Sequence, residues 1–389
     1  MFDLVAAHRE EYGNEPQVIA SAPGVVNLIG EESYYNEGYV LQIALNRNVR
    51  VAISRRGDNS LRFFAADTGE RKRTTISNLK YKREDRWANI PKGVLQQYIK
   101  AGQTFRGLDF TFYGDIPRGI GLASSAAMGV ATALALSNLL GTGTAEKDII
   151  MYASKAESSF IGRDKGVSDH LISCVAEEGN AVFLDLRSLT YTMSPLDLGN
   201  ILILITNSNV PMFITEEDLS RRKVECQECV SCLNNWRTGN SLRDYTTADL
   251  KHGMGIVPEA IRKICLHVVE ENKRVLNAKD ALNSGNYQIF GKIMNRSHES
   301  LRDNYEVSCP ELDWLVKRAW EIEGVYGSRM IGSGLGGCTV TLLESSAVEA
   351  YSRRLAEYEH IFGFNAETIV CNPAGGAKII YRSQENQDT

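Results

Sequence analysis

The spacing of hydrophobic and polar residues changes along this chain, and each change marks a predicted element. Leu108, Phe110 and Phe112 alternate with more polar neighbours, as expected for a β-strand with one buried face. Residues 49–53 repeat this alternation, and residues 201–206 form a short apolar run that suits a buried strand. These segments therefore predict three strands spread over both halves of the chain.

Hydrophobic residues at helical spacing predict helices between the strands. The predicted helical ranges are 87–101, 215–233, 258–284, 311–322 and 346–358. Two further strands are expected on either side of residues 332–337, a last strand over 377–381, and a disordered polar tail over 383–389. Strands and helices in this mixed order predict an α+β fold built in layers.

Composition places the chain among ordinary globular enzymes. Its 389 residues exceed the size at which one hydrophobic core usually suffices, so two domains are expected. The net charge of −5 gives no electrostatic reason to expect nucleic acid as a partner. No apolar run reaches the length of a membrane span, and residues 1–16 lack the apolar core of a signal peptide. We therefore expect a cytoplasmic protein with no membrane partner and with reduced cysteines.

Three of the eight cysteines form a Cys-x-x-Cys-x-x-Cys pattern, at Cys226, Cys229 and Cys232. Such spacing is found in metal sites, but no fourth ligand stands at a matching distance in the sequence. On a helix, Cys226 and Cys229 share an apolar face with Leu219 and Leu233, whereas Cys232 lies off that face. We therefore interpret this pattern as core packing rather than as a metal site.

A glycine-punctuated, hydroxyl-rich loop at residues 117–127 runs directly into an Ala/Leu-rich helical pattern that ends at Gly141. A strand, a flexible loop and a helix start bring free backbone N–H groups and the positive end of the helix dipole to one point. This arrangement suits a polyphosphate ligand. A serine-rich helix cap with a tight turn would look the same in the sequence, so both interpretations stay open at this point.

Residues 332–337 match the Gly-x-Gly-x-x-Gly string of dinucleotide-binding folds, but the match is misleading. That fingerprint requires a helix directly after it, whereas residues 338–343 are β-branched and apolar and predict a strand. The glycines are better explained as a hairpin-like turn whose bare backbone can approach another loop or a ligand. No Gly-x-x-x-x-Gly-Lys-Ser/Thr motif occurs in the sequence, which excludes a P-loop kinase.

Three segments, in order along the chain, resemble the three motifs of one kinase superfamily, which groups galactokinase, homoserine kinase, mevalonate kinase and phosphomevalonate kinase. The segments are Ala22–Glu31, Pro117–Ala127 and Met330–Val340. Within this superfamily, the phrases at 185–189 and 308–313 are similar to those of galactokinases. The resemblance covers residues 22–377, nearly the whole chain, and three ordered motifs are far more specific than any one of them.

The resemblance implies a two-domain small-molecule kinase fold with the active site in the cleft between the domains. We place the domains at residues 1–199 and 200–389, with motifs one and two in the first and the third glycine motif in the second. It also implies an ATP-dependent sugar kinase that transfers the γ-phosphoryl group of ATP to the anomeric hydroxyl of a monosaccharide, with galactose as the substrate typical of the family. Mg²⁺ is the implied cofactor, a sugar the implied partner, and we expect a monomer.

Site residues follow from the family motifs position by position. Asp169 matches the catalytic aspartate, which would accept the proton of the sugar hydroxyl. Ser125 and Glu157 match the magnesium ligands, whose hard oxygens suit Mg²⁺, although Glu157 could also be a solvated helix carboxylate. The expected ATP-binding residues are Pro117, Gly119, Gly121, Leu122, Ala123, Ser124, Ser125, Ala126, Gly334 and Gly336. The expected sugar-binding residues are Glu31, Glu32, Tyr34, Gly166 and Asp169.

This chain departs from galactokinases where the sugar should bind. Val25 stands where they carry an arginine, Glu32 replaces a histidine, and Tyr34 replaces the aspartate that binds galactose hydroxyls. A sugar-contacting tyrosine is also missing, and Leu219 lies near its place. A valine cannot neutralise charge in the transition state, and altered hydroxyl partners should change the preferred sugar. Two interpretations therefore stand: a sugar kinase with altered specificity, or a weak or inactive relative that binds nucleotide or sugar and has a regulatory role.

Further departures lie beside Asp169. Ser168 and His170 replace a methionine and a glutamine, and we expect His170 to pack or hydrogen-bond rather than act as a second base. Lys165 lies four residues before Asp169, where galactokinases usually have an uncharged residue. We hypothesise that Lys165, or else Arg163, supplies the charge of the missing arginine as a second catalytic group and keeps Asp169 ionised. An exposed loop lysine without a role is the alternative.

Overall fold

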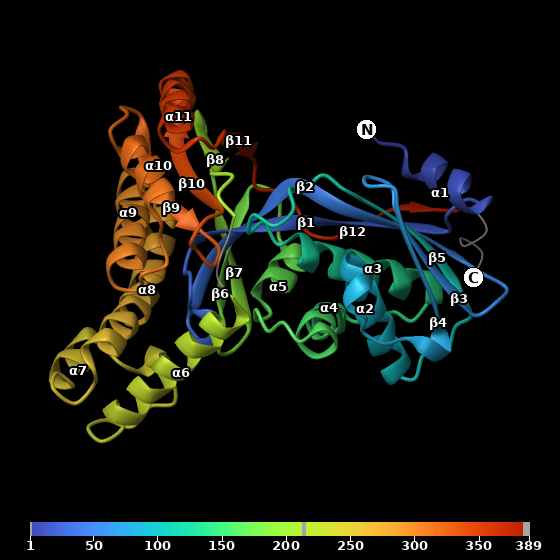
Figure 1. Cartoon of the computed structure of the whole chain (residues 1–389), viewed down its shortest axis with the longest axis horizontal. Helices are drawn as coiled ribbons and strands as arrows, with labels where there is room; N and C mark the ends of the chain where they lie inside the picture. The colour runs from blue at the N-terminus through green and yellow to red at the C-terminus, as the bar shows by residue number, and fades with distance from the viewer. Residues whose placement is uncertain (1, 212–214, 384–389) are drawn as a thin grey trace.

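An eight-stranded sheet and a four-stranded sheet form the framework of the protein in the computed structural model, which describes residues 2–211 and 215–383 (Figure 1). The larger sheet contains β1 (Val18–Ile29), β2 (Tyr39–Arg55), β3 (Ser60–Ala65), β4 (Glu70–Thr75), β5 (Leu108–Gly114), β6 (Asn180–Asp185), β7 (Thr190–Pro195) and β12 (Lys378–Arg382). Its order is β12-β1-β2-β5-β3-β4, with β6 paired to both β2 and β7. The β3–β5 pair is parallel, and the other pairs are antiparallel.

Four helices cover one face of this sheet and bury its hydrophobic cluster. They lie together below the sheet in Figure 1 and are α2 (Asn89–Lys100), α3 (Ser124–Leu140), α4 (Glu146–Lys155) and α5 (Ser168–Val175). α3 is apolar on almost every side and packs directly against β1 and β2. It is therefore a buried central helix, and only its N-terminal turn reaches the loop that follows β5.

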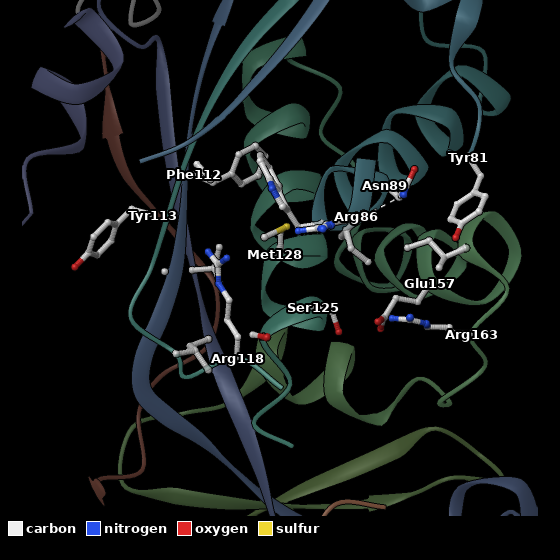
Figure 2. Close-up of a pocket in the computed structure, with 18 of the residues that line it drawn as sticks. Tyr81, Arg86, Asn89, Phe112, Tyr113, Arg118, Ser125, Met128, Glu157 and Arg163 are labelled. Carbon is white, nitrogen blue, oxygen red and sulfur yellow. Dashed lines mark hydrogen bonds between the residues drawn. The ribbon is translucent and has the colours of Figure 1, made fainter. Parts of the chain in front are cut away.

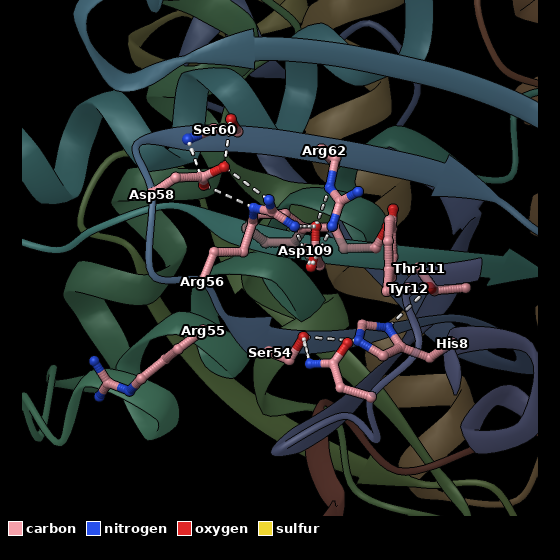
Figure 3. Close-up of polar contacts among 12 residues, drawn as sticks. His8, Tyr12, Ser54, Arg55, Arg56, Asp58, Ser60, Arg62, Asp109 and Thr111 are labelled. Atoms are coloured by element: carbon pink, nitrogen blue, oxygen red, sulfur yellow. Dashed lines mark hydrogen bonds and ion pairs between the residues drawn. The ribbon is translucent and has the colours of Figure 1, made fainter. Parts of the chain in front are cut away.

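The opposite face of the sheet is partly covered by α1 (Leu4–Tyr12), which buries the polar side chains of β5 (Figure 3). Asp109 accepts a hydrogen bond from Arg62 Nε at 2.7 Å, and the Thr111 hydroxyl lies 2.9 Å from His8 Nδ1. Burial raises the pKa of Asp109 to about 6, against the opposing charge of Arg56. The polar positions of this strand are therefore held in buried contacts beneath α1.

The smaller sheet and its helices stand at the other end of the molecule in Figure 1. Its strands follow the antiparallel order β11-β8-β10-β9, with bounds β8 (Ile201–Asn207), β9 (Val325–Ile331), β10 (Cys338–Glu344) and β11 (Glu367–Cys371). The helices around it are α6 (Glu216–Leu233), α7 (Thr247–His252), α8 (Glu259–Asn283), α9 (Tyr287–Asp303), α10 (Pro310–Trp320) and α11 (Val348–Phe362). β9 and β10 flank the third glycine motif, as expected, and α8 also contacts β1 and β2 of the larger sheet.

The predicted strands and helices are present, with small shifts at their ends. The helix expected from residue 215 begins one residue later because the Thr215 hydroxyl accepts a hydrogen bond from the backbone N–H of Asp218 and caps α6. The helix expected from residue 87 is preceded by a 3₁₀ turn, η3 (Arg83–Ala88), and α2 itself starts at Asn89. Arg86 within this turn has a φ of 45°, which breaks the helical path.

The α+β prediction is confirmed, but α1, α4, α5, α7 and α9 were not among the expected helices, and α9 is the longest of these. Its buried residues Phe290, Met294 and Leu301 recur at helical spacing, so the signal was present in the sequence. The expected domain boundary near residue 200 lies between β7 and β8, and β12 returns to the larger sheet; the boundary stays a prediction. Of the predicted tail, residues 384–389 lie outside the described residues. Within the described chain, none of the helices combines the length and apolar character needed to cross a membrane.

Candidate active site

The three glycine motifs, far apart in the sequence, meet at one place. The backbone N–H of Val25 donates to the carbonyl of Leu122 at 3.2 Å, which joins motif one to motif two. A Cβ atom on Gly121 would lie 3.6 Å from the Cα atom of Gly332, so motif two touches motif three. The N–H of Gly332 donates to Glu31 Oε1 at 3.0 Å, which joins motif three to motif one. The prediction that the third motif is a turn with closely approached backbone is therefore confirmed.

Motif two ends in a left-handed turn that presents the start of α3. Gly119 and Gly121 have φ values of 75° and 86°, and Ala123 also has a positive φ, of 53°. An alanine in this region is strained, and such strain is concentrated at functional sites. Among the described residues no side chain caps the start of α3, so the N–H groups from Ser124 onward are available at a helix N-terminus, where an anion is favoured.

Two cavities meet at this helix start. The first, called the aromatic cavity, has a volume of about 410 Å³, and its lining includes the rings of Tyr81, Trp87 and Phe112 (Figure 2). The second, called the acidic cavity, has a volume of about 350 Å³, and its lining includes the carboxyl groups of Glu31, Glu32 and Asp169. Ser124, Ser125, Glu157 and Arg163 line both cavities. The two cavities therefore adjoin at the predicted magnesium ligands.

The aromatic cavity combines flat rings with positive charge. Trp87 and Phe112 pack edge to face with their ring centroids 5.2 Å apart, and Arg83, Arg86 and Arg118 lie around them. Rings of this kind can stack on a planar base, and guanidinium groups suit phosphate oxygens. These residues were not predicted. Their signal was the run of aromatic and basic residues at 81–87, which resembles an ordinary helix start when only periodicity is considered.

The predicted magnesium ligands lie together at the junction of the cavities. Burial alone would raise the pKa of Glu157, but contacts with His170 and the Ser125 hydroxyl outweigh it and hold this pKa below its usual value. His170 is buried, with its Nε2 atom 3.1 Å from Glu157 Oε2, so it packs against the predicted magnesium ligand. The result is an ionised carboxylate beside a hydroxyl oxygen.

Two hard oxygen donors at this junction suit Mg²⁺, which is commonly held by one or two protein oxygens together with substrate phosphates. The described residues contain no group of three or more His, Cys, Asp or Glu side chains that could hold a metal ion by themselves. The Ser125 and Glu157 pair therefore fits a magnesium ion that arrives with a nucleotide, and does not form a complete protein cage.

Asp169 lies in the first turn of α5 at the base of the acidic cavity. Its Oδ1 atom accepts a hydrogen bond from Gln42 Nε2 at 2.9 Å. Burial raises the pKa of Asp169, although the charge of His170, the Gln42 hydrogen bond and the charge of Lys165 act in the opposite direction. A buried carboxyl group with a raised pKa inside a cavity is a typical proton acceptor.

Glu31 is held from both halves of the chain. Asn27 Nδ2 donates to its Oε2 atom at 3.1 Å, and the fully buried Arg329 of β9 lies 3.6 Å from its Oε1 atom. Burial raises the pKa of Glu31, while the charge of Arg329 opposes that shift. Glu31 therefore has a fixed position in the acidic cavity.

Glu32, which replaces the family histidine, lies among tyrosine hydroxyls. Tyr35 and Tyr305 both donate to its Oε2 atom, at 3.1 Å and 3.0 Å, and the two hydroxyls also contact each other. Burial and the neighbouring charge of Glu31 raise the pKa of Glu32 to about 7. The partners of Glu32 lie up to 273 residues away, so its buried setting could not be predicted from the motif.

Tyr34 forms one wall of the acidic cavity and packs against Gly166. A Cβ atom on Gly166 would lie 3.2 Å from Tyr34 Cβ and Cδ2, and Gly166 has a φ of +76°, so a larger residue would be strained there. Gly166 thus contacts the predicted sugar site through Tyr34. Leu219 of α6 also lines this cavity, and its place beside a bound sugar stays a prediction.

Val25, at the position where galactokinases carry an arginine, is part of the hydrophobic core. Val25 is 1% exposed and lies in a hydrophobic cluster with Leu171 and Ile172 of α5. Lys165 lines the acidic cavity, and its charge lowers the pKa of both Glu157 and Asp169. Within the described residues, no hydrogen bond or ion pair joins Lys165 to Asp169. Lys165 therefore lies at the acidic cavity without a direct bond to Asp169, and its role as the replacement cation stays a prediction.

The remaining predicted residues lie beside the cavities or away from them. Gly119, Gly121, Leu122 and Ala123 line the acidic cavity. Ala126 is buried in α3, and neither it nor Pro117 lines either cavity. A Cβ atom on Gly334 would lie 2.1 Å from the carbonyl oxygen of Val307, and one on Gly336 would lie 2.5 Å from that of Pro211. These two glycines allow close backbone packing, and their role toward ATP stays a prediction.

The cysteine pattern belongs to a second hydrophobic cluster. Cys226 and Cys229 pack there with Leu233, as their helix face predicts, whereas Cys232 is only partly buried. Cys265 of α8 joins them, and burial raises its pKa well above the usual value. All eight cysteines are free thiols.

Family models match three parts of the chain. A galactokinase galactose-binding signature matches residues 6–55, the N-terminal domain of GHMP kinases matches residues 89–177, and the C-terminal region of GHMP kinases matches residues 278–360. These segments contain motif one, motif two with Glu157 and Asp169, and motif three, respectively.

Sequence relatives match over nearly the full length. A galactokinase from Roseiflexus sp. is 38% identical over 377 residues, which cover 96% of each chain. The galactokinase of Homo sapiens is 39% identical, with 96% of this chain and 95% of the human protein covered. A putative galactokinase from Treponema pallidum is 34% identical, with 96% of each chain covered.

Solved structures show the same fold. A Lactococcus lactis galactokinase complexed with galactose superposes with a TM-score of 0.91 at 28% identity, covering 96% of this chain and 98% of that one. The mevalonate kinase of Methanococcus jannaschii superposes with a TM-score of 0.66 at 16% identity, covering 92% and 99% of the two chains, and shows the likeness of fold alone.

Proposed function

Because this chain belongs to the galactokinase family and is an ATP-dependent sugar kinase, we propose that it transfers the γ-phosphoryl group of ATP to the anomeric hydroxyl of a monosaccharide held in the acidic cavity. The observation that carries this proposal is the junction of the cavities at Ser125 and Glu157. A nucleotide in the aromatic cavity with its phosphates at the start of α3 directs its terminal phosphate toward that junction. A sugar in the acidic cavity then meets it from the other side.

Each group at the junction has a role in the proposed reaction. Asp169 accepts the proton of the sugar hydroxyl as the oxygen attacks phosphorus. Ser125 and Glu157 would hold Mg²⁺, which supplies charge neutralisation to the phosphates. Glu31, fixed by Asn27 and Arg329, accepts hydrogen bonds from sugar hydroxyls. We place the protein in the cytoplasm as a monomer, where its free cysteines stay reduced.

We propose that the preferred sugar differs from galactose, the reference substrate of the family. Tyr34 presents an aromatic wall where a carboxylate would bind hydroxyls, and Glu32 presents a carboxyl group where an imidazole would stand. A site that binds hydroxyls discriminates strongly when its partners change. A sugar with an apolar or acetamido substituent, or one that lacks a hydroxyl, should fit better against the Tyr34 ring.

The proposal is tested by following ADP release from Mg-ATP with hexoses, pentoses, deoxy sugars and amino sugars. We expect at least one sugar to give turnover, with kcat/KM for galactose below about 10⁴ M⁻¹s⁻¹. Tyr34→Asp should raise kcat/KM for galactose relative to the preferred sugar, with Tyr191→Asp on the exposed part of β7 as the control. Mg-ATP binding without ADP release for any sugar would favour the regulatory alternative.

A further inference from the structure

Gln42 of β2 makes a direct contact with the proposed base. Its side chain is 2% exposed and lines the acidic cavity, and its Nε2 atom donates to Asp169 Oδ1 at 2.9 Å. This is the hydrogen bond that the structure gives to the Asp169 carboxyl group within the described residues. The other oxygen, Oδ2, receives no hydrogen bond from them and stays available.

The orientation of the Gln42 amide follows from chemistry. To accept a proton Asp169 must be ionised, and an ionised carboxylate only accepts hydrogen bonds, so the Gln42 amide turns its nitrogen toward Asp169 and its oxygen away. That oxygen, Oε1, is buried and has no donor among the described residues. A buried unpartnered carbonyl costs free energy, and an apolar side chain of similar size would avoid this cost. Packing alone therefore gives no reason for a glutamine at this position.

The strand register places a second amide side chain beside Gln42, and this amide also donates a hydrogen bond to a carboxyl group. Asn27 of β1 is directly opposite Gln42 in the antiparallel β1–β2 pair, so both side chains face the same side of the sheet. Asn27 Nδ2 donates to Glu31 Oε2 at 3.1 Å, and Asn27 Oδ1 is likewise buried without a donor. Two neighbouring amides thus each use their nitrogen to hold one carboxyl group of the acidic cavity.

We propose that Gln42 is a positioning residue that orients Asp169 for proton transfer, an inference that rests on the proposed function. With Oδ1 held by the amide, Oδ2 faces the sugar hydroxyl. The O–H bond then breaks, and its proton goes to Oδ2. The sugar oxygen forms the new bond to the γ-phosphorus, and the bond from that phosphorus to the bridging oxygen breaks to release ADP. In this proposal Gln42 orients the base. Lys165 supplies positive charge, which the side chain of Val25 cannot provide.

The test replaces Gln42 by methionine, which has similar size and no hydrogen-bonding nitrogen. We expect kcat with the preferred sugar to fall about tenfold or more, because a misdirected base loses near-attack geometry. KM for ATP and the melting shift caused by Mg-ATP should stay at wild-type values, since Gln42 lines the acidic cavity and not the aromatic one. The melting temperature should be unchanged or higher, because the unpartnered carbonyl is removed.

Gln97 of α2 provides a matched control. It is also a buried glutamine, 6% exposed, with an unpartnered amide atom, Nε2, and it lines neither cavity. Gln97→Met should therefore leave kcat unchanged. Gln42→Asn, which withdraws the nitrogen from Asp169 but keeps an amide, should also lower kcat and serves if the methionine variant folds poorly. In an Asp169→Asn background, Gln42→Met should cause no further loss of residual turnover if it acts through Asp169.

The outcomes separate the inference from the proposed function. If the wild-type protein turns over a sugar and both Gln42→Met and Gln42→Asn have the wild-type kcat, the positioning role is contradicted. The proposed function then still stands. Loss of kcat together with lower melting temperature and lost Mg-ATP binding shows a structural role and also overturns it. A wild-type protein without turnover on any sugar contradicts the proposed function, and the positioning role falls with it.

Discussion

Glu32 shows how one residue changes the electrostatics of the acidic cavity, the proposed sugar site. Two tyrosine hydroxyls donate to one of its oxygens, while burial and the adjacent Glu31 disfavour its ionised form. Its pKa near 7 lies above its ordinary value of 4.5, so the folded protein holds a proton that the unfolded chain releases. The free energy of unfolding must therefore fall as pH rises from about 4.5 toward 7.

Glu32→Gln should remove this pH-dependent fall in the free energy of unfolding, because an amide does not ionise. We expect the variant to gain about 1–3 kcal/mol of stability relative to wild type at pH 8, and much less at pH 5, where Glu32 is protonated in the folded protein. Denaturant unfolding at both pH values measures this difference. Glu10→Gln, on the exposed side of α1, is the control. An equal effect of Glu32→Gln at the two pH values would contradict the raised pKa.

Lys165 is the residue that we propose compensates for the arginine that Val25 replaces. It lines the acidic cavity, and its charge acts on both Glu157 and Asp169. Lys165→Met should lower kcat about 10- to 100-fold, because a cation that neutralises transition-state charge is removed. Steady-state kinetics with the preferred sugar measures the change, and Lys155→Met at the exposed end of α4 is the control.

Val25→Arg distinguishes a relocated cation from a lost one. If Lys165→Met removes turnover that Val25→Arg then restores, the positive charge has moved from one strand to a nearby loop. If Lys165→Met has no effect while Val25→Arg raises turnover steeply, compensation is refuted and the natural protein is a weakened kinase. Since Val25 packs against Leu171 and Ile172, the arginine variant must also be checked for stability.

At the scale of elements, the close approach of α9 to β9 depends on two glycines. A Cβ atom on Gly291 would lie 2.0 Å from the carbonyl oxygen of Tyr326, and one on Gly327 would lie 2.3 Å from the carbonyl oxygen of Gly291. Helix and strand backbones therefore touch without side chains between them. This contact holds β9, and with it Arg329 and the third glycine motif, against the helical layer.

Gly291→Ala tests this contact against helix propensity. Alanine favours a helix over glycine by about 1 kcal/mol, so an isolated helix would become more stable. Here we expect a net loss of about 1–3 kcal/mol, because the added methyl group pushes α9 away from β9. Urea unfolding, monitored by circular dichroism, measures this change in the free energy of unfolding. Gly57→Ala, whose Cβ would meet nothing within 4 Å, should change stability little, and a stabilised Gly291→Ala protein would refute the close contact.

At the scale of the whole molecule, the proposed nucleotide site is assembled from several elements of the larger sheet and its helices. The aromatic cavity takes side chains from η3, β5 and α3, and Ser125 and Glu157 connect it to the acidic cavity. Arg329 of β9 and Gly332 of motif three reach Glu31 from the other half of the chain. Ligands that bridge these parts should therefore stabilise the whole protein.

Mg-ATP should raise the melting temperature by mass action. At a hundredfold excess over Kd the stabilisation is about 2.7 kcal/mol, a shift of several degrees that a thermal-shift assay can measure. Ser125→Ala combined with Glu157→Gln should remove most of the magnesium dependence, because both oxygen ligands are weakened. Glu146→Gln in the first turn of α4 is the control. The absence of any shift at millimolar Mg-ATP would count against the nucleotide site.

Local patterns in the sequence were sufficient for the fold class and about half of the helices and strands, and the resemblance of short motifs supplied the candidate site residues. Hydrophobic periodicity is a property of neighbouring residues, so β5, β8, α6 and α8 were predictable within a few residues. Motif two also lies within a short segment, so the start of its helix could be located from the local pattern, whereas the proposed base Asp169 was located by the resemblance of its phrase to the family motif.

Contacts across the molecule were decided only by the tertiary structure. The hydrogen bond from Gln42 to Asp169 spans 127 residues, and Arg329 reaches Glu31 only because β9 ends beside β1. The aromatic cavity, the tyrosine cluster around Glu32 and the burial of Val25 likewise depend on which surfaces the sheets and helices bring together. Periodicity specifies which face of an element is apolar, whereas strand register and helix packing determine what that face meets.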